Sequence, residues 1–239
     1  MTQPEARILR VRQIQSHAGF TLIELLVVIA IIAILASMLM PAISKAKSSG
    51  QKAACLSNLH QVGIAMQMYA EDFKGLIPRG NDVVWFQAFM PYVPEGGKNN
   101  DFRVIRIFKC PSYPNKKQVV CYVINSWYFN NLTSAAGTDL YAATPLSRVD
   151  RPAETIYLAD NENGSWRPIV TGYQDAELVQ NDVWDLTHLP NSNATDAMYG
   201  RRVARNRHLG GPNVLHFDGH SGFVKAQKMT ADMWREVWR

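Results

Sequence analysis

The sequence predicts an α+β protein in which a long N-terminal helix packs on a C-terminal head built around an antiparallel sheet. Three observations lead to this prediction. Residues 20–40 are almost continuously apolar, residues 41–75 repeat apolar side chains every three or four positions, and residues 76–239 mix short β-branched runs with turn-forming segments. The 239 residues leave room for one sizeable head beyond the apolar run.

The apolar run begins at Phe20 and ends at Met40. It contains three polar residues: Thr21, Glu24 and Ser37. As a helix, these 21 residues would be about 31 Å long, which matches the hydrocarbon thickness of a bilayer. A carboxylate at mid-bilayer costs about 2.5 kcal/mol or more, so Glu24 calls for a specific role.

The next segment, residues 41–75, has the pattern of an amphipathic helix that continues the first. Its apolar positions are Leu56, Leu59, Val62, Met66, Tyr69 and Phe73. We expect the helix to end before Gly75 and to bend or fray locally at Pro41 and Gly50. Its apolar stripe would then lie on the head.

The head shows a short helix, several strands and a long irregular segment. We predict a helix at 83–93, strands at 119–125 and 155–159, a hairpin of 213–217 with 222–225, and a terminal helix at 230–238. Residues 163–207 are rich in loops. They contain a basic group, Arg201, Arg202, Arg205 and Arg207. We expect a solvated face there rather than a nucleic-acid patch, and no nucleic acid as a partner.

The residues around the N-terminal glycine carry a family resemblance. A basic leader ends at Gly19, Phe20-Thr21-Leu22-Ile23-Glu24 follows, and Pro41 lies 22 residues beyond the glycine. This order resembles type IV prepilins and the pseudopilins of type II secretion. The resemblance implies that residues 1–19 are a leader, that a prepilin peptidase cuts between Gly19 and Phe20, and that Phe20 is then N-methylated.

The same resemblance implies a structural protein and not an enzyme. Residues 20–40 would hold the chain in the inner membrane as a single pass, with the N-terminus cytoplasmic and the head periplasmic or in a surface filament. Its partners would be the prepilin peptidase and other pilin-like subunits, with the pilin fold expected overall. Glu24 would pair with the new α-amine of a neighbouring subunit and so guide assembly into a type IV pilus or a secretion pseudopilus.

Two other interpretations of the N-terminus compete with this one. A secretory signal would be cut after a shorter apolar core, for example near residues 33–36. A plain membrane anchor leaves Gly19 and Glu24 unexplained. Basic residues lie on both sides of the apolar run, at Arg7, Arg10, Arg12, Lys45, Lys47 and Lys52, so charge alone does not fix the orientation.

A second motif lies near the C-terminus. His208 is followed by nine residues and then by Asp218-Gly219, within the text RHLGGPNVLHFDGHSGFV. With the segment from Cys55 to Pro78, this resembles a subgroup of the prepilin-like proteins. An alternative function follows, namely a membrane-tethered extracytoplasmic module that binds or transforms a ligand at His208 and Asp218. A purely structural role is the other reading, with Asp218 bonding within its own turn and His208 fixing a loop.

Metal and disulfide sites are weakly indicated. Oxygen-rich loops at Asp160, Glu162 and Asp218 make calcium the ion to consider. There is no C-x-x-C pair to indicate a zinc ribbon. Outside the cytoplasm a disulfide is permitted, with Cys110 and Cys121 as the better pair and Cys55 left over, and free buried thiols are the alternative.

Overall fold

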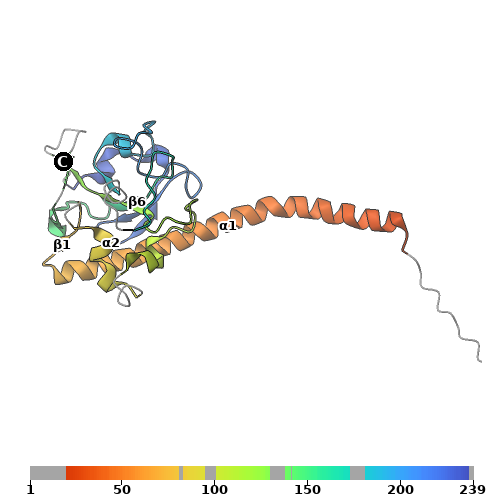
Figure 1. The fold of residues 1–239 in the computed structure, drawn as a ribbon, viewed down its shortest axis with the longest axis horizontal. Helices are drawn as coiled ribbons and strands as arrows, with labels where there is room; N and C mark the ends of the chain where they lie inside the picture. Colours follow the sequence, from red (N-terminus) through yellow and green to blue (C-terminus); the bar gives the residue numbers. More distant parts are fainter. Residues whose placement is uncertain are drawn as a thin grey trace, which may run out of the picture. The chain divides into compact units, whose positions relative to one another are not determined.

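The computed structural model describes residues 20–80, 83–94, 101–129, 138–140, 142–172 and 181–236. Contacts divide the chain into two compact units, residues 1–45 and 46–239, and the division falls within the first helix. The predicted leader, with Gly19, lies outside the described residues. Figure 1 shows the order of the elements along the chain.

The first helix, α1, spans Leu22–Asp72 and confirms the predicted long N-terminal helix. It remains helical through Pro41 and Gly50, so the expected local fraying at these residues is not seen. It ends because Gly75 takes a positive φ of 81° and donates its N–H to the Ala70 carbonyl at 2.7 Å. In the second unit α1 buries one face, formed by Cys55, Leu59, Val62, Gly63, Ala65, Met66, Tyr69 and Ala70.

The centre of the second unit is a five-stranded sheet in the order β7-β2-β6-β8-β9. The strands are β7 Asp182–Val183, β2 Tyr122–Asn125, β6 Ile156–Asp160, β8 Asn213–His216 and β9 Ser221–Phe223. The pairs of β2 with β6, β6 with β8 and β8 with β9 are antiparallel, whereas β7 runs parallel to β2. The predicted hairpin is confirmed as β8 and β9.

Side chains on the sheet alternate between two apolar clusters, as strand geometry requires. Tyr122 and Leu215 join the cluster that contains the buried face of α1. Val123 and Val214 join the opposite cluster, which contains Trp234. All five residues of β6 are buried because the strand has neighbours on both edges and is covered on both faces.

The remaining regular structure is short. Two small sheets pair β1 Leu76–Ile77 with β5 Thr144–Pro145 and β3 Trp127–Tyr128 with β4 Thr138–Asp139. Among the residues that the structure describes, the one further α-helix is α2 Trp85–Ala88. The 3-10 turns are η1 Met90–Tyr92, η2 Phe102–Val104, η3 Arg106–Phe108, η4 Leu146–Arg148, η5 Leu186–His188, η6 Ala226–Lys228 and η7 Ala231–Trp234.

Three predicted elements differ in the structure. The helix at 83–93 is split into α2 and η1. The strand at 119–125 begins at Tyr122, because the backbone N–H groups of Val119 and Cys121 donate to the carbonyls of Val170 and Phe108 instead of a neighbouring strand. The terminal helix at 230–238 is a single 3-10 turn, η7, within the part of the chain that is described.

The turn between β8 and β9 lies directly against α1. Gly219 takes a positive φ of 91° in this turn, and a Cβ on Gly63 would lie 2.6 Å from the Gly219 carbonyl oxygen. The contact is reinforced by a hydrogen bond from Ser221 Oγ to the Leu56 carbonyl at 3.1 Å and one from Gln67 Nε2 to the Phe217 carbonyl at 3.4 Å. The Asp218-Gly219 motif is therefore the point at which the sheet meets α1.

A methyl group at Gly63 should destabilise the protein. We expect Gly63→Ala to lower the free energy of unfolding by about 1 to 3 kcal/mol, because the backbone at Gly219 cannot move away without disturbing the hairpin. Thermal unfolding of the full chain in detergent, followed by circular dichroism, measures the effect.

Gly50→Ala, in the same helix, is the matched control. Apart from the neighbouring backbone of the helix itself, no atom would lie within 4 Å of the added Cβ. This control should be neutral or should gain up to about 1 kcal/mol from helix propensity. Equal melting temperatures for Gly63→Ala and wild type would contradict the close approach of α1 to the turn.

Candidate functional site

The N-terminus of α1 forms a capping box. Thr21 precedes the first helical residue, and its Oγ1 accepts a hydrogen bond from the Glu24 backbone N–H at 3.3 Å. In return, Glu24 Oε2 accepts from the Thr21 backbone N–H at 2.9 Å and from Thr21 Oγ1 at 2.7 Å. The carboxylate thus satisfies orphan donors at the positive end of the helix dipole. Phe20, the residue after the predicted cut, is 70% exposed.

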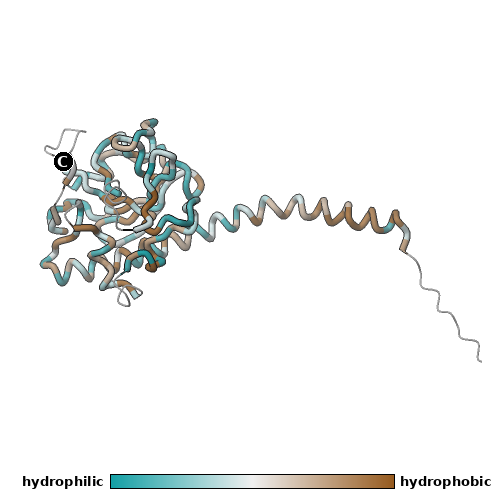
Figure 2. The backbone as a smooth tube through the Cα atoms, in the orientation of Figure 1, coloured by the Kyte–Doolittle hydropathy of each residue, from teal (hydrophilic) through white to brown (hydrophobic). Residues whose placement is uncertain are grey.

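The first unit presents an apolar surface along α1. Its large apolar side chains between Phe20 and Ile43 are 45% to 74% exposed, and in Figure 2 the backbone of this part of α1 is mostly brown, the colour of hydrophobic residues. By length and composition, α1 is able to cross a membrane. Soluble monomers rarely expose an apolar surface of this extent, and with the apolar composition of the helix it fits a membrane anchor.

A second site lies inside the second unit, where four polar side chains converge. Cys55 comes from α1, Cys110 follows η3, Asp160 ends β6 and His208 precedes β8. One ligand atom from each lies within 4.8 Å of all the others, and all four residues are buried. We call these four residues the Cys-Asp-His cluster.

The closest contacts in the Cys-Asp-His cluster involve Asp160 and His208. His208 Nε2 lies 3.1 Å from Asp160 Oδ2 and 3.4 Å from Cys110 Sγ. Cys55 Sγ donates to Asp160 Oδ1 at 3.3 Å. The side chains of Asp160 and His208 have no exposed surface, so solvent does not reach these contacts.

Neighbouring groups hold the cluster in place. Ser112 Oγ lies 3.4 Å from His208 Nδ1, Tyr122 OH lies 3.5 Å from Cys55 Sγ, and the Asn213 N–H donates to Asp160 Oδ2 at 2.7 Å. The backbone that carries the histidine is unusual. His208, Leu209 and Gly210 take positive φ values of 48°, 71° and 108°, a conformation that costs energy in non-glycine residues.

The charges in the cluster differ from those of free side chains. Burial alone would lower the pKa of His208, but the hydrogen bonds with Asp160 and Cys110 raise it to about 9. A hydrogen bond with Cys55, together with His208, lowers the pKa of Cys110 to about 6 despite burial. Burial raises the pKa of Cys55 well above its usual value. Cys110 is therefore the thiol that ionises first.

The two residues of the C-terminal motif separate into different contacts. His208 belongs to the buried cluster, whereas Asp218 lies in the hairpin turn and accepts from the His220 backbone N–H at 3.0 Å. Asp218 Oδ1 also lies 2.6 Å from His220 Nδ1. The motif therefore supplies one buried anchor and one turn, and the two residues do not meet in one ligand site.

Of the two alternatives for Cys110 and Cys121, a disulfide and free buried thiols, the structure contains the second. Cys110 faces His208 and not Cys121. Cys55, which was left over in the sequence analysis, is a member of the cluster. The sequence named Cys110 only for a possible disulfide and missed the joint site of Cys55 and Cys110, because no short motif joins them.

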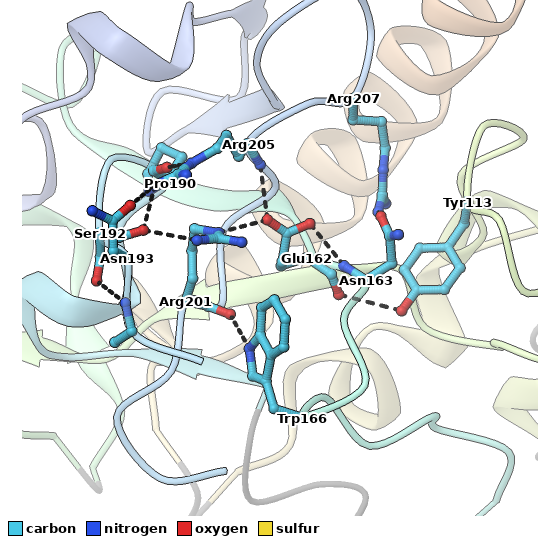
Figure 3. Close-up of polar contacts among 11 residues, drawn as sticks. Tyr113, Glu162, Asn163, Trp166, Pro190, Ser192, Asn193, Arg201, Arg205 and Arg207 are labelled. Atoms are coloured by element: carbon cyan, nitrogen blue, oxygen red, sulfur yellow. Dashed lines mark hydrogen bonds and ion pairs between the residues drawn. The ribbon is translucent and has the colours of Figure 1, made fainter. Parts of the chain in front are cut away.

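Glu162 and Asp218 do not join Asp160 as the sequence suggested for calcium. Within the described residues, the one group of potential metal ligands is the Cys-Asp-His cluster. Glu162 Oε2 accepts instead from Arg201 Nε at 2.8 Å and from the Arg205 backbone N–H at 3.2 Å (Figure 3). Calcium binding remains a prediction without a site that these residues share.

The basic group at residues 201–207 is not a solvated face, and that prediction is wrong. Arg201, Arg202 and Arg207 are buried. Arg202 forms an ion pair with Asp182, and Arg207 Nη2 donates to Asn163 Oδ1 at 2.7 Å. Figure 3 shows Arg201, Arg205 and Arg207 gathered around Glu162 and Asn163, in the loop that follows β6.

A buried histidine fixes the same loops. His188 Nδ1 accepts from the Trp184 backbone N–H at 3.3 Å, and His188 Nε2 lies 3.2 Å from the Met198 carbonyl oxygen. These contacts suit a neutral imidazole with its proton on Nε2. Burial, and then the charge of Arg202, lower the pKa of His188 to about 3.

The comparisons with known proteins identify the N-terminal region. A family model described as the prokaryotic N-terminal methylation motif matches residues 14–40. The searches of the curated proteins and of the solved structures gave no match. The chain thus carries a prepilin-type methylation motif on an apolar transmembrane-type helix, followed by an α+β head in a layout that fits the pilin-like fold.

The neutral state of His188 predicts a loss of stability in mild acid. Its folded pKa lies near 3 and its unfolded pKa near 6.5, so between these values only the unfolded chain takes up the proton. We expect this residue alone to cost about 1.4 kcal/mol per pH unit as the pH falls below about 6.

Melting temperatures of wild type and of His188→Gln between pH 6.5 and 5 measure this cost. The wild-type melting temperature should fall more steeply with acid than that of the variant. His60→Gln, at an exposed histidine of α1, is the control and should keep the wild-type slope. Identical slopes for His188→Gln and wild type would contradict a neutral buried imidazole.

Proposed function

We propose that this chain is a pilin-like structural subunit. A prepilin peptidase cuts it between Gly19 and Phe20 and methylates the new α-amine of Phe20. The apolar half of α1 then anchors the subunit in the inner membrane, with the head outside the cytoplasm. Finally, the same half of α1 packs against its copies in a type IV pilus-like or secretion pseudopilus filament.

The observation that carries this proposal is the exposed apolar half of α1 beside a matched methylation motif. Moving one Leu or Ile side chain from water into apolar surroundings lowers the free energy by about 1.5 to 3 kcal/mol. Exposure of the apolar half of α1 to water is therefore unfavourable. Lipid or a bundle of identical helices would remove these side chains from water. The two surroundings suit the two stages of the proposed pathway.

Transfer from lipid to a helix bundle gains little from hydrophobicity, because lipid tails are as apolar as the side chains. Close packing and polar contacts must therefore favour the filament. Glu24 is the one charged residue in the segment 20–40 and is suited to this task. Once the leader is removed, the α-amine of a neighbouring Phe20 is a cation able to compensate its charge.

Processing is tested by the intact mass and N-terminal sequence of the protein from membranes that contain a prepilin peptidase. We expect the chain to begin at methylated Phe20. Gly19→Asp should instead leave a species heavier by the mass of residues 1–19. His17→Asp adds the same charge two positions earlier and should still be cut. A wild-type chain that begins at Met1 would contradict processing and favour a membrane-tethered module.

The role of Glu24 is tested by two variants that separate its charge from its capping contacts. Glu24→Gln keeps a residue able to complete the capping box but removes the charge. Thr21→Ala removes the capping side chain and keeps the charge. We expect Glu24→Gln to lose most of the sheared filament yield, and Thr21→Ala to retain most of it.

Equal amounts of both proteins in the membrane, measured by immunoblot, show that neither variant is degraded. The opposite order of yields would assign Glu24 to capping. Normal filaments from Glu24→Gln would remove the proposed charge pairing.

A further inference from the structure

We propose that the Cys-Asp-His cluster binds one Zn²⁺ ion, with Cys55 Sγ, Cys110 Sγ, His208 Nε2 and one carboxylate oxygen of Asp160 as its four ligands. The site lies wholly within the second unit. The inference does not depend on cleavage, membrane insertion or filament assembly.

The distances between the ligand atoms fit a tetrahedral ion. Zinc bonds to sulfur, nitrogen and oxygen are about 2.0 to 2.3 Å, which places tetrahedral ligands about 3.3 to 3.8 Å apart. Asp160 Oδ2 lies 3.1 Å from His208 Nε2, the other oxygen, Oδ1, lies 3.3 Å from Cys55 Sγ, and Cys110 Sγ lies 3.4 Å from His208 Nε2. The four ligand atoms lie within 4.8 Å of one another, so shifts of up to about 1 Å would complete the shell.

The direction of the contacts also favours an ion over a proton relay. In a nucleophile–histidine–carboxylate relay, the carboxylate and the nucleophile face different ring nitrogens. Here Asp160 and Cys110 both face His208 Nε2, which carries one proton or one lone pair. Side chains that crowd one nitrogen in this way are arranged as ligands around a common centre.

The surroundings are those of a metal-binding histidine. His208 Nδ1, the nitrogen turned away from the cluster, lies beside Ser112 Oγ at 3.4 Å. A partner on this second nitrogen fixes the ring and its tautomer in most metal sites. The Asn213 N–H likewise orients Asp160 at 2.7 Å.

The donor atoms select the kind of ion. Two sulfurs and one imidazole nitrogen suit zinc, whereas calcium takes oxygen ligands almost exclusively. Four protein ligands without an exposed position are typical of a structural zinc site and not of a catalytic one. On binding, the ion would displace to solvent the Cys55 thiol proton, any proton still on Cys110 and one imidazolium proton, so that two thiolates, a carboxylate and a neutral imidazole remain.

The site would tie α1 to the head. Its ligands come from α1, from the segment after η3, from the end of β6 and from the loop before β8. These segments are far apart in the sequence, so a shared ion would restrain the whole second unit. A bound ion would also explain the strained backbone at His208, because that conformation points Nε2 into the cluster.

The test uses the full chain, purified in detergent through a tag without histidines. Metal analysis by mass spectrometry should find about one zinc per chain. Replacement by Co²⁺ should produce thiolate-to-cobalt absorption and the visible bands of tetrahedral cobalt. Cys110→Ser and Asp160→Asn should lose most of the zinc. Cys121→Ser, at the buried thiol outside the cluster, and His60→Ala, at an exposed histidine, should retain it.

Several outcomes would overturn the proposal. Wild-type protein without zinc, and without the thiolate bands after cobalt is added, excludes the site even where a variant fails to fold. An intact mass lower by two hydrogens, with a peptide that links Cys55 to Cys110, would assign the cluster to a disulfide. Equal zinc in Cys110→Ser and wild type would place the metal elsewhere.

Discussion

The close approach of α1 to the turn between β8 and β9 is the constraint on which the second unit depends. The approach requires a glycine at Gly63 in the helix, where a Cβ would lie 2.6 Å from the Gly219 carbonyl oxygen, and the turn itself requires Gly219, whose φ is 91°. Once the two backbones are this close, polar side chains of one element reach the main chain of the other, as Asn213 Nδ2 does at the Lys52 carbonyl. The cysteine on α1 is then brought to the ends of β6 and β8. Helix docking and the buried cluster are therefore parts of one arrangement.

Buried charges hold the irregular part of the head. The described residues between β6 and β8 have little regular structure, so their backbone groups do not satisfy one another in a ladder. Buried arginines take over this role: Arg201 joins Glu162 to the Ser192 carbonyl, and Arg202 joins Asp182 to the Met198 carbonyl. A buried ion pair of Arg79 with Glu236 is a further example. Breaking such a pair would leave an uncompensated buried charge, which is costly, so these pairs favour the loop conformation in which each charge has its partner.

Local patterns predicted the parts of the fold that depend on local chemistry. Neighbouring residues alone determine three features: the apolar run, the end of α1 at Gly75 and the hairpin at Asp218-Gly219. The structure contains each of them. The role of Asp218 within its own turn was foreseen for the same reason. The two-residue strands could not be predicted from the sequence, because they form only through pairing with other segments of the chain. The arginines between β7 and β8 looked solvated because their acidic and carbonyl partners are distant in the sequence. Cys55 and Cys110 were missed on the same grounds, since each meets its partners across about a hundred residues.

The capping box at Thr21 and Glu24 bears on how readily the proposed filament would come apart. In the single chain the carboxylate already accepts two hydrogen bonds, from the Thr21 backbone N–H and from Thr21 Oγ1, so an incoming amine competes with bonds that exist and does not simply fill an empty acceptor. A helix cap stabilises a helix by about 0.5 to 2 kcal/mol, and a subunit that leaves the filament would regain this stabilisation when the cap forms again. Each subunit would therefore carry its own substitute partner for Glu24, which lowers the barrier to extraction into lipid. A fibre built in this way would be suited to repeated growth and retraction.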